Sequence, residues 1–130
     1  MTGCPNSGNR DQTVILIADD EALIRIVAKI ALEKKGYLIL TCQDGEEALH
    51  ISRSFPGIIH AVLSDVKMPK VNGLELREQI LAERPGIKVL LMSGQMDSRL
   101  PSNVEFLRKP FGPSVLQDRM RTLLASPASV

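Results

Sequence analysis

Three aspartates stand at the ends of two short apolar runs of this chain. Residues 14–18 are apolar and are followed by Asp19 and Asp20, and the run 61–64 is followed by Asp65. If both runs are strands of one parallel sheet, their carboxyl ends lie along the same edge, where the three carboxylates would repel one another. A hard divalent cation with oxygen ligands, typically Mg²⁺, relieves that repulsion. The pattern therefore predicts a metal-assisted phosphoryl site built on strand ends.

Composition narrows the class of protein that could carry such a site. The chain has 130 residues, 44% of them hydrophobic, and a formal net charge of +1. This length predicts one domain with one buried core, and the charge argues against nucleic acid as the main partner. No apolar run is long enough to span a bilayer, and the polar start lacks the apolar segment of a secretory signal. We therefore expect a cytoplasmic protein with no membrane association.

The two cysteines predict neither a disulfide framework nor a metal centre. Cys4 lies in a leader rich in Gly, Pro, Asn and Ser, and Cys42 closes an apolar run. Two cysteines without histidine neighbours make a poor zinc site. We interpret Cys42 as a small core residue.

Short apolar runs alternate with helical patterns along the chain, which predicts β-α units around a parallel sheet. The expected strands are Val14–Ala18, Leu38–Cys42, Ala61–Ser64, Val89–Met92 and Val104–Leu107. The expected helices are Ala22–Lys35, a segment from the N-cap Asp44 to Phe55, Gly73–Glu83, and a last helix that follows Gly112-Pro113. Residues 1–12 are expected to be a disordered leader, 13–125 the folded domain, and 126–130 a short tail.

The connection between the last two expected strands is too short for a regular helix. Residues 94–105 separate Ser93 from Phe106, and they include Gly94 and Pro101, which disfavour helix. We expect an irregular or single-turn segment over Asp97–Leu100, so that the fourth helix of the sheet is shortened or missing.

These motifs resemble the receiver domains of two-component response regulators, of the chemotaxis CheY type. The resemblance covers residues 13–125 and rests on motifs at or just beyond strand ends: Asp19-Asp20, Asp65, Met68-Pro69 with Gly73, Ser93-Gly94 and Lys109-Pro110-Phe111. Each motif is weak alone, but the ordered set is highly specific. The resemblance implies an α/β fold with a doubly wound, five-stranded parallel sheet in the flavodoxin-like order 2-1-3-4-5. Its ligand site lies at the switch point between the first and third strands.

The resemblance also implies a phosphoacceptor that signals by a conformational switch and is not an enzyme in the usual sense, since it would catalyse only its own phosphorylation and dephosphorylation. Asp65 would accept a phosphoryl group from a phosphohistidine on a histidine kinase or a histidine phosphotransfer protein. The Mg²⁺ ligands would be Asp19, Asp20, Asp65 and the backbone carbonyl of Lys67. Taken alone, Asp19 and Asp20 are also consistent with capping the following helix.

Further roles are implied for the motifs after the fourth and fifth strands. Lys109 would pair with Asp65 at rest and with a phosphoryl oxygen afterwards, and the Lys109–Pro110 bond would be cis. Ser93 would donate its hydroxyl to the phosphoryl group, and its movement together with Phe106 would form the switch. Phe106 lacks the hydroxyl of the tyrosine that the family often has there, and it is equally consistent with an ordinary core residue.

The helix expected over Ala22–Lys35 carries two apolar rows. The row expected to face the core is Ile24, Val27, Ala28 and Ala31, and the second row is Leu23, Ile26 and Ile30. A helix on a sheet needs only one row for its core. Because this helix of the family often docks on the kinase or phosphotransfer partner, we expect part of the second row to be exposed for docking. The alternative is that a neighbouring helix buries both rows.

Rival interpretations fit less well. A haloacid-dehalogenase-like phosphatase needs a second aspartate two residues after its nucleophile, where this chain has Lys67. A flavodoxin-like cofactor binder needs a Ser/Thr/Gly-rich loop after the first strand, where this chain has Asp-Asp-Glu. A phosphorylation-independent pseudo-receiver would lack an acidic or lysine residue of the set. A receiver excised from a hybrid histidine kinase remains an open alternative. We expect the chain to pass its signal on through protein–protein contacts or by phosphoryl relay. We expect it to be a monomer or a weak dimer.

Overall fold

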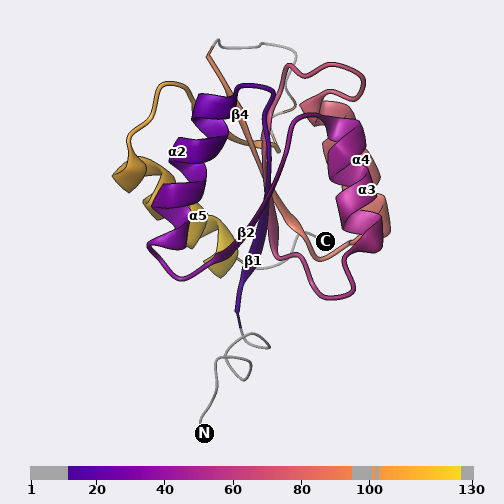
Figure 1. Cartoon of the computed structure of the whole chain (residues 1–130). Coiled ribbons are helices and arrows are strands. Elements are labelled where there is room, and N and C mark those ends of the chain that lie inside the picture. Colours follow the sequence, from indigo (N-terminus) through magenta and orange to yellow (C-terminus); the bar gives the residue numbers. More distant parts are fainter. Residues whose placement is uncertain (1–11, 95–100, 102, 127–130) are drawn as a thin grey trace, which may run out of the picture.

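The computed structural model describes residues 12–94, 101 and 103–126. Its five parallel strands follow the order β2-β1-β3-β4-β5, which confirms the predicted doubly wound sheet. The strands are β1 (Val14–Ala18), β2 (Leu38–Cys42), β3 (Ala61–Asp65), β4 (Lys88–Ser93) and β5 (Glu105–Arg108). On one face of the sheet lie α2 (Ala22–Glu33) and α5 (Pro113–Ala125), and on the other lie α3 (Gly45–Ser54) and α4 (Gly73–Glu83) (Figure 1).

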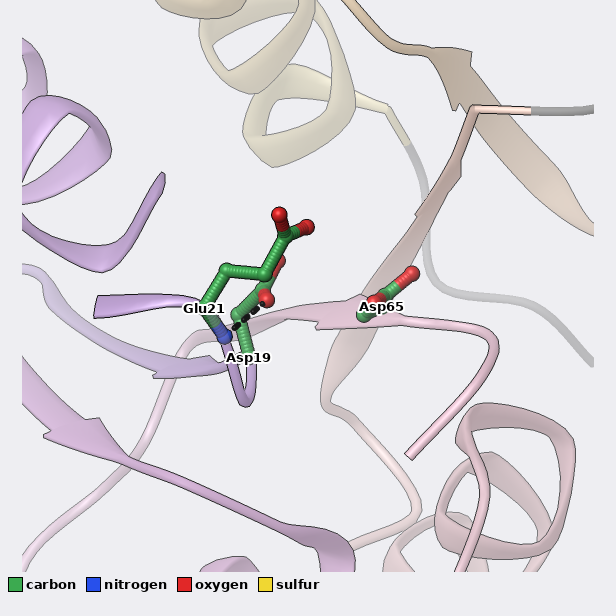
Figure 2. Close-up of side chains that lie close together, drawn as sticks. All are labelled: Asp19, Glu21 and Asp65. Carbon is green, nitrogen blue, oxygen red and sulfur yellow. Dashed lines mark hydrogen bonds between the residues drawn. The ribbon is translucent and has the colours of Figure 1, made fainter. Parts of the chain in front are cut away.

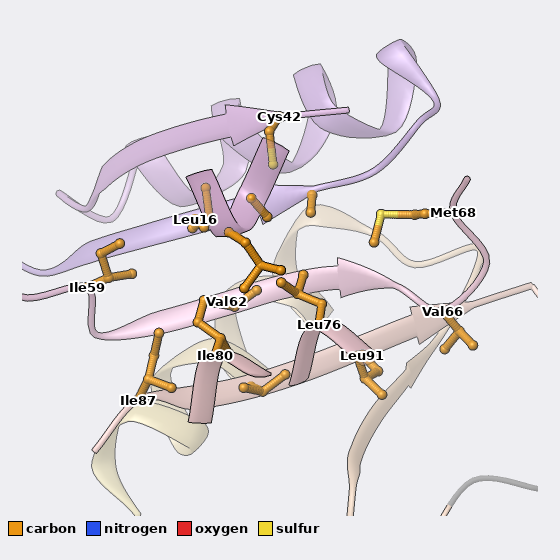
Figure 3. Packing of buried hydrophobic residues seen from close by; sticks show 14 of the residues in the cluster. Leu16, Cys42, Ile59, Val62, Val66, Met68, Leu76, Ile80, Ile87 and Leu91 are labelled. Carbon is orange, nitrogen blue, oxygen red and sulfur yellow. The ribbon is translucent and has the colours of Figure 1, made fainter. Parts of the chain in front are cut away.

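The central strands are buried on both faces, which explains their nearly unbroken apolar sequences. Every residue of β1 and β3 is buried. Side chains of β1 alternate between the faces: Ile15 and Ile17 join the cluster with α2 and α5, whereas Leu16 joins the cluster with α3 and α4. Figure 3 shows this last cluster, in which Leu16 and Val62 of the sheet pack near Ile80 of α4. The core therefore holds in place the two strands whose ends carry the aspartates.

Side-chain caps fix where α3 and α4 begin. Asp44 accepts a hydrogen bond from the backbone N–H of Glu47 (2.8 Å), as predicted, but the Glu47 carboxylate accepts from Gln43 and not from the capping residue. The bounds predicted for α4 are correct, but its N-terminus also has a full capping box that was not predicted. Asn72 accepts from the Glu75 N–H (2.9 Å), and Glu75 accepts from the Asn72 N–H (3.0 Å). Such a cap stabilises a helix by about 1 kcal/mol.

The buried stripe of α2 differs from the predicted one. Val27, expected in the core row, is 39% exposed, and the fully buried Leu32 takes its place. The reason is the neighbour: α5 packs against α2 at Ala31, where the Gln117 side chain donates to the Ala31 carbonyl (2.7 Å). With this contact in place, the buried side of α2 is formed by Ala28, Ala31 and Leu32, and Val27 lies outside the core. The helix also ends two residues before the predicted Lys35.

The connection between β4 and β5 contains no helical residue among those described there, which are Gly94, Pro101, Asn103 and Val104. The single turn predicted over Asp97–Leu100 lies outside the described residues. β5 begins at Glu105, one residue later than predicted. Within the described part of the chain, no helix has both the length and the apolar character needed to cross a membrane.

Candidate functional site

Three carboxylates gather where β1 and β3 end. Oxygens of Asp19, Glu21 and Asp65 all lie within 4.8 Å of one another (Figure 2). Asp19 and Asp65 are buried, whereas Glu21 is exposed. Sequence reasoning missed Glu21, although it stands two residues after Asp19. A local hydrogen bond brings it in, because the Glu21 N–H donates to Asp19 Oδ1 (2.8 Å) and turns the chain back toward the site.

Asp20 takes a different position from its two neighbours. Its side chain is not one of this group of three; the residue is exposed and lines an adjoining cavity of about 530 Å³. Lys67 and Met68, in the loop after β3, line the same cavity. The predicted ligand residues therefore lie along one edge, with Asp19 and Asp65 inside it and Asp20 at its rim beside Lys67.

Lys109 sits among the carboxylates. Its Nζ lies 2.9 Å from Asp19 Oδ2, 3.2 Å from Glu21 Oε1 and 3.5 Å from Asp65 Oδ2. The pair with Asp65 implied at rest is present, but the shortest contact is to Asp19. The backbone N–H of Lys109 donates to the Ser93 carbonyl (2.8 Å), which continues the pairing of β4 and β5 by one residue. The Lys109–Pro110 peptide bond is cis.

The pKa of Asp65 depends on its burial and on the charges around it, where one ammonium faces more than one carboxylate. Burial raises this pKa above its ordinary value of 3.8, and the charges of Asp19 and Asp20 add to the effect, while Lys109 opposes it. Burial lowers the pKa of Lys109, but the hydrogen bond and charge of Asp19, with Asp65 and Glu21, outweigh it and raise that pKa overall. The uncompensated negative charge and the all-oxygen donors fit a hard divalent cation such as Mg²⁺.

A close backbone contact fixes the end of β3. A Cβ atom on Gly73 would lie 2.4 Å from the Asp65 carbonyl oxygen and 2.9 Å from Val66 Cα. The Gly73 N–H donates to the Val66 carbonyl (2.8 Å), so the start of α4 is held directly against the strand end. Only glycine leaves room for this approach.

Ser93 and Phe106 occupy the neighbouring strands. Ser93 is buried at the carboxyl end of β4, which pairs with β3 so that Met92 lies opposite Asp65. Phe106 is half-buried and packs against the core cluster shared with α3 and α4. The structure thus brings Ser93 to the edge that holds Asp65, with Phe106 on the adjoining strand.

Cys42 behaves as a core residue, as interpreted from the sequence. Burial, with the charges of Glu47 and Asp44, raises the pKa of its thiol to about 12. The thiol lies 3.6 Å from the Ile17 carbonyl oxygen. It is therefore protonated at neutral pH and is a poor nucleophile or metal ligand.

Comparison with known proteins identifies relatives over most of the chain. The response regulator receiver domain family matches residues 15–121. The sensor kinase CckA of Brucella abortus is 32% identical over 118 residues, which are 86% of this chain and 12% of that protein. The solved receiver domain of the hybrid histidine kinase CckA is 34% identical, with a TM-score of 0.75, covering 85% of this chain and 98% of that one. TrrA of Thermotoga maritima, solved in complex with Mg²⁺-BeF, is 31% identical, with a TM-score of 0.74, covering 86% and 99%.

The chain matches only part of its curated relatives. It spans 12% of the length of the Brucella kinase and about half the length of other relatives, two probable transcriptional regulators ycf27 and the response regulator RR06. The shared unit is therefore the domain that carries the acidic edge.

The contact at Gly73 leads to a first prediction. Gly73→Ala should push the end of β3 away. On the phosphoacceptor role that the resemblance implies for Asp65, this change should slow its labelling by small phosphodonors at least about tenfold, since small misplacements of a reacting group are costly. Gly86→Ala is the matched control, because a Cβ at Gly86 meets no atom within 4 Å. Labelling rates should be compared under conditions where circular dichroism shows both variants folded. Equal rates for the two variants would mean that the contact does not position Asp65.

The charge balance leads to a second prediction, for the metal-free protein. Asp65→Asn should raise the free energy of unfolding at pH 7, because the ionised, buried carboxylate costs stability above its raised pKa. The cost disappears as the pH falls below the ordinary value of 3.8, where the carboxyl is protonated both folded and unfolded. Denaturant titrations over a range of pH would show the advantage of the variant shrinking with acidification. An advantage that stays constant with pH would contradict this origin.

Proposed function

The chain belongs to the receiver domain family of response regulators, and on that basis we propose that Asp65 is the residue that accepts the phosphoryl group. The family consists of signalling phosphoacceptors that work with histidine kinases or phosphotransfer proteins in two-component systems. The observation that carries the residue assignment is the meeting of Asp19, Asp65 and Lys109 at three strand ends. These groups supply a nucleophile, a cation ligand and a fixed positive charge.

The proposed reaction needs little beyond correct placement and neutralised charge. A carboxylate oxygen of Asp65 attacks the phosphorus of a phosphohistidine, the phosphorus–nitrogen bond breaks, and an acyl phosphate forms. The imidazole leaves with the electron pair and takes up a proton from solvent. Lys109, already 3.5 Å from Asp65, then pairs with a phosphoryl oxygen. In the resting site, Asp19, Asp65 and Glu21 raise the pKa of Lys109 overall, so its ammonium is charged before the reaction.

We assign the cation ligands to Asp19, Asp20, Asp65 and the backbone carbonyl of Lys67. The fit rests on oxygen donors along one edge and on the negative charge that Lys109 leaves unbalanced. When bound, Mg²⁺ would supply positive charge to the phosphoryl oxygens. Glu21 adds a further carboxylate at the solvent side of the same edge.

Ser93 and Phe106 are the proposed switch. A phosphoryl group brings nearly two negative charges and new acceptor oxygens to the edge, which favours a conformation with the Ser93 hydroxyl turned toward it. Phe106 packs against the α3 and α4 cluster on the strand next to Ser93. Movement of Ser93 would therefore shift the population between two packings of this ring.

The second apolar row of α2 is exposed, and we assign it to partner docking. Leu23 is 71% exposed, Ile26 53% and Ile30 50%. The alternative that a neighbouring helix buries both rows is therefore wrong. Since α2 begins directly after the acidic edge, a helix of a histidine kinase or phosphotransfer protein lying on this row would sit beside Asp65.

The nucleophile assignment is tested with acetyl phosphate and Mg²⁺. Wild-type protein should gain one phosphoryl group that is labile to base and hydroxylamine, as an acyl phosphate is, and Asp65→Asn should gain none at that position. Asp118→Asn is the control, because Asp118 is an exposed carboxylate on α5. Intact-mass spectrometry and peptide mapping give the readout. Labelling of the Asp65→Asn variant at the wild-type rate would disprove the assignment.

The docking surface is tested separately from the chemistry. Ile26→Glu should slow transfer from a phosphorylated histidine kinase about tenfold or more, because it puts a charge into an apolar contact. Labelling by acetyl phosphate should stay at the wild-type rate. Ile58→Glu, at another exposed isoleucine (69%) in the loop before β3, is the control and should transfer normally. Unchanged transfer to the Ile26→Glu variant would exclude this surface.

A further inference from the structure

Arg25 donates a hydrogen bond to the backbone of the acidic edge. Its Nη1 lies 2.6 Å from the carbonyl oxygen of Asp19, and the residue is half-buried. Arg25 stands at the end of the first turn of α2, where the positive end of the helix dipole disfavours a cation. The arginine is therefore placed against the field of its own helix, and its contact with Asp19 compensates for this.

The carbonyl that Arg25 contacts lies where the pairing of β1 with β2 runs out. The Asp19 N–H donates to the Cys42 carbonyl (3.2 Å), and Cys42 is the last residue of β2. The next rung of a parallel ladder would take its N–H from Asp44. Asp44 is instead the N-cap at which the chain turns into α3. The guanidinium of Arg25 supplies the donor at this point, and a buried carbonyl left without a donor would destabilise the turn.

The rest of Asp19 points into the site. Its Oδ1 accepts the N–H of Glu21 (2.8 Å), and its Oδ2 accepts from Lys109 (2.9 Å). Arg25 is the group that holds the carbonyl, and so the peptide plane that joins Asp19 to Asp20. The direction of that plane decides how the two carboxylates are presented to a common cation.

We propose that Arg25 is a positioning residue of this site, which orients the Asp19–Asp20 peptide so that both carboxylates can bind Mg²⁺. The proposal rests on the function proposed above for these two aspartates. It gives Arg25 a role through the backbone, with no contact to the phosphoryl group required.

Removal of the arginine distinguishes this role from simple electrostatics, because the two predict opposite changes in Mg²⁺ affinity. If Arg25 acted only through its positive charge, its loss would strengthen Mg²⁺ binding, because a repelling cation is removed. If it positions the turn, its loss weakens Mg²⁺ binding, by about tenfold for a group that orients a ligand. If it only stabilises the fold, the free energy of unfolding falls and Mg²⁺ affinity does not change.

The experiment compares Arg25→Met with Lys29→Met. Lys29 lies on the same helix, pairs with Glu33 (3.4 Å), and makes a control that also removes one positive charge. Calorimetric titration with Mg²⁺ should show about tenfold weaker binding for Arg25→Met, and unchanged or tighter binding for Lys29→Met. Asp20→Asn sets the loss expected from removing a ligand. Hydrogen exchange of the Glu21 amide, which donates to Asp19, should lose protection in Arg25→Met alone.

Wild-type or tighter Mg²⁺ binding by Arg25→Met, with unchanged protection of the Glu21 amide, would overturn the proposal. If Arg25→Met does not fold, Arg25→Gln decides, because its neutral side chain is two atoms shorter than that of arginine and cannot make the same contact with the Asp19 carbonyl. Weaker Mg²⁺ binding by Arg25→Gln supports positioning, and unchanged or tighter binding refutes it. If the wild-type chain binds no Mg²⁺, the proposed function fails. The protection of the Glu21 amide alone then shows whether Arg25 orients the Asp19–Asp20 peptide.

Discussion

Lys109 holds together carboxylates that would otherwise repel one another, and the rest of the site is arranged around this contact. Its ammonium lies within 3.5 Å of Asp19, Glu21 and Asp65, which come from the ends of β1 and β3 and the turn after β1. Burial, with the charges of Asp19 and Asp20, outweighs this one positive charge, so the pKa of Asp65 stays above its ordinary value. The buried strands supply the stability that keeps the charges in place. The residual negative charge favours binding of a cation at this edge.

Much of this arrangement could be predicted because it follows from strand ends. Buried parallel strands require nearly continuous apolar runs, so the strands and the edge that gathers Asp19 and Asp65 could be predicted from the residues themselves. The strand order and the place of Lys109 beside Asp65 followed only from the resemblance to receiver domains. Glu21 could not be predicted in this way, because a hydrogen bond to Asp19 turns its exposed side chain back. The exposure of Val27 was also missed, since the periodicity of one helix does not say where α5 packs against it.

The loop after β3 shows a second constraint that periodicity cannot reveal. A Cβ on Gly73 would clash with the Asp65 carbonyl, and a Cβ on Gly45 would lie 2.3 Å from the Val71 carbonyl oxygen. Between these two contacts Lys70 adopts a left-handed conformation (φ 69°) and pairs with Glu46 at 3.4 Å. The loop that carries the Lys67 carbonyl is therefore held against the starts of two helices. The end of β3 therefore lies against the start of α4, and the loop that follows it lies against the start of α3.

The turn after β1 joins recognition to chemistry in the same way. Residues 19–25 carry Asp19 and Asp20, then Glu21, and then the first turn of α2, whose exposed Leu23 is the first residue of the row proposed for docking. Arg25 spans this turn, since its backbone belongs to the helix and its guanidinium holds the Asp19 carbonyl. Under the docking and Mg²⁺-binding roles proposed above, a partner that contacts α2 would therefore act on the peptide that joins Asp19 to Asp20. Docking of a histidine kinase and the placement of Asp19 would then be coupled through Arg25, whereas a small phosphodonor would reach Asp65 without contacting the helix.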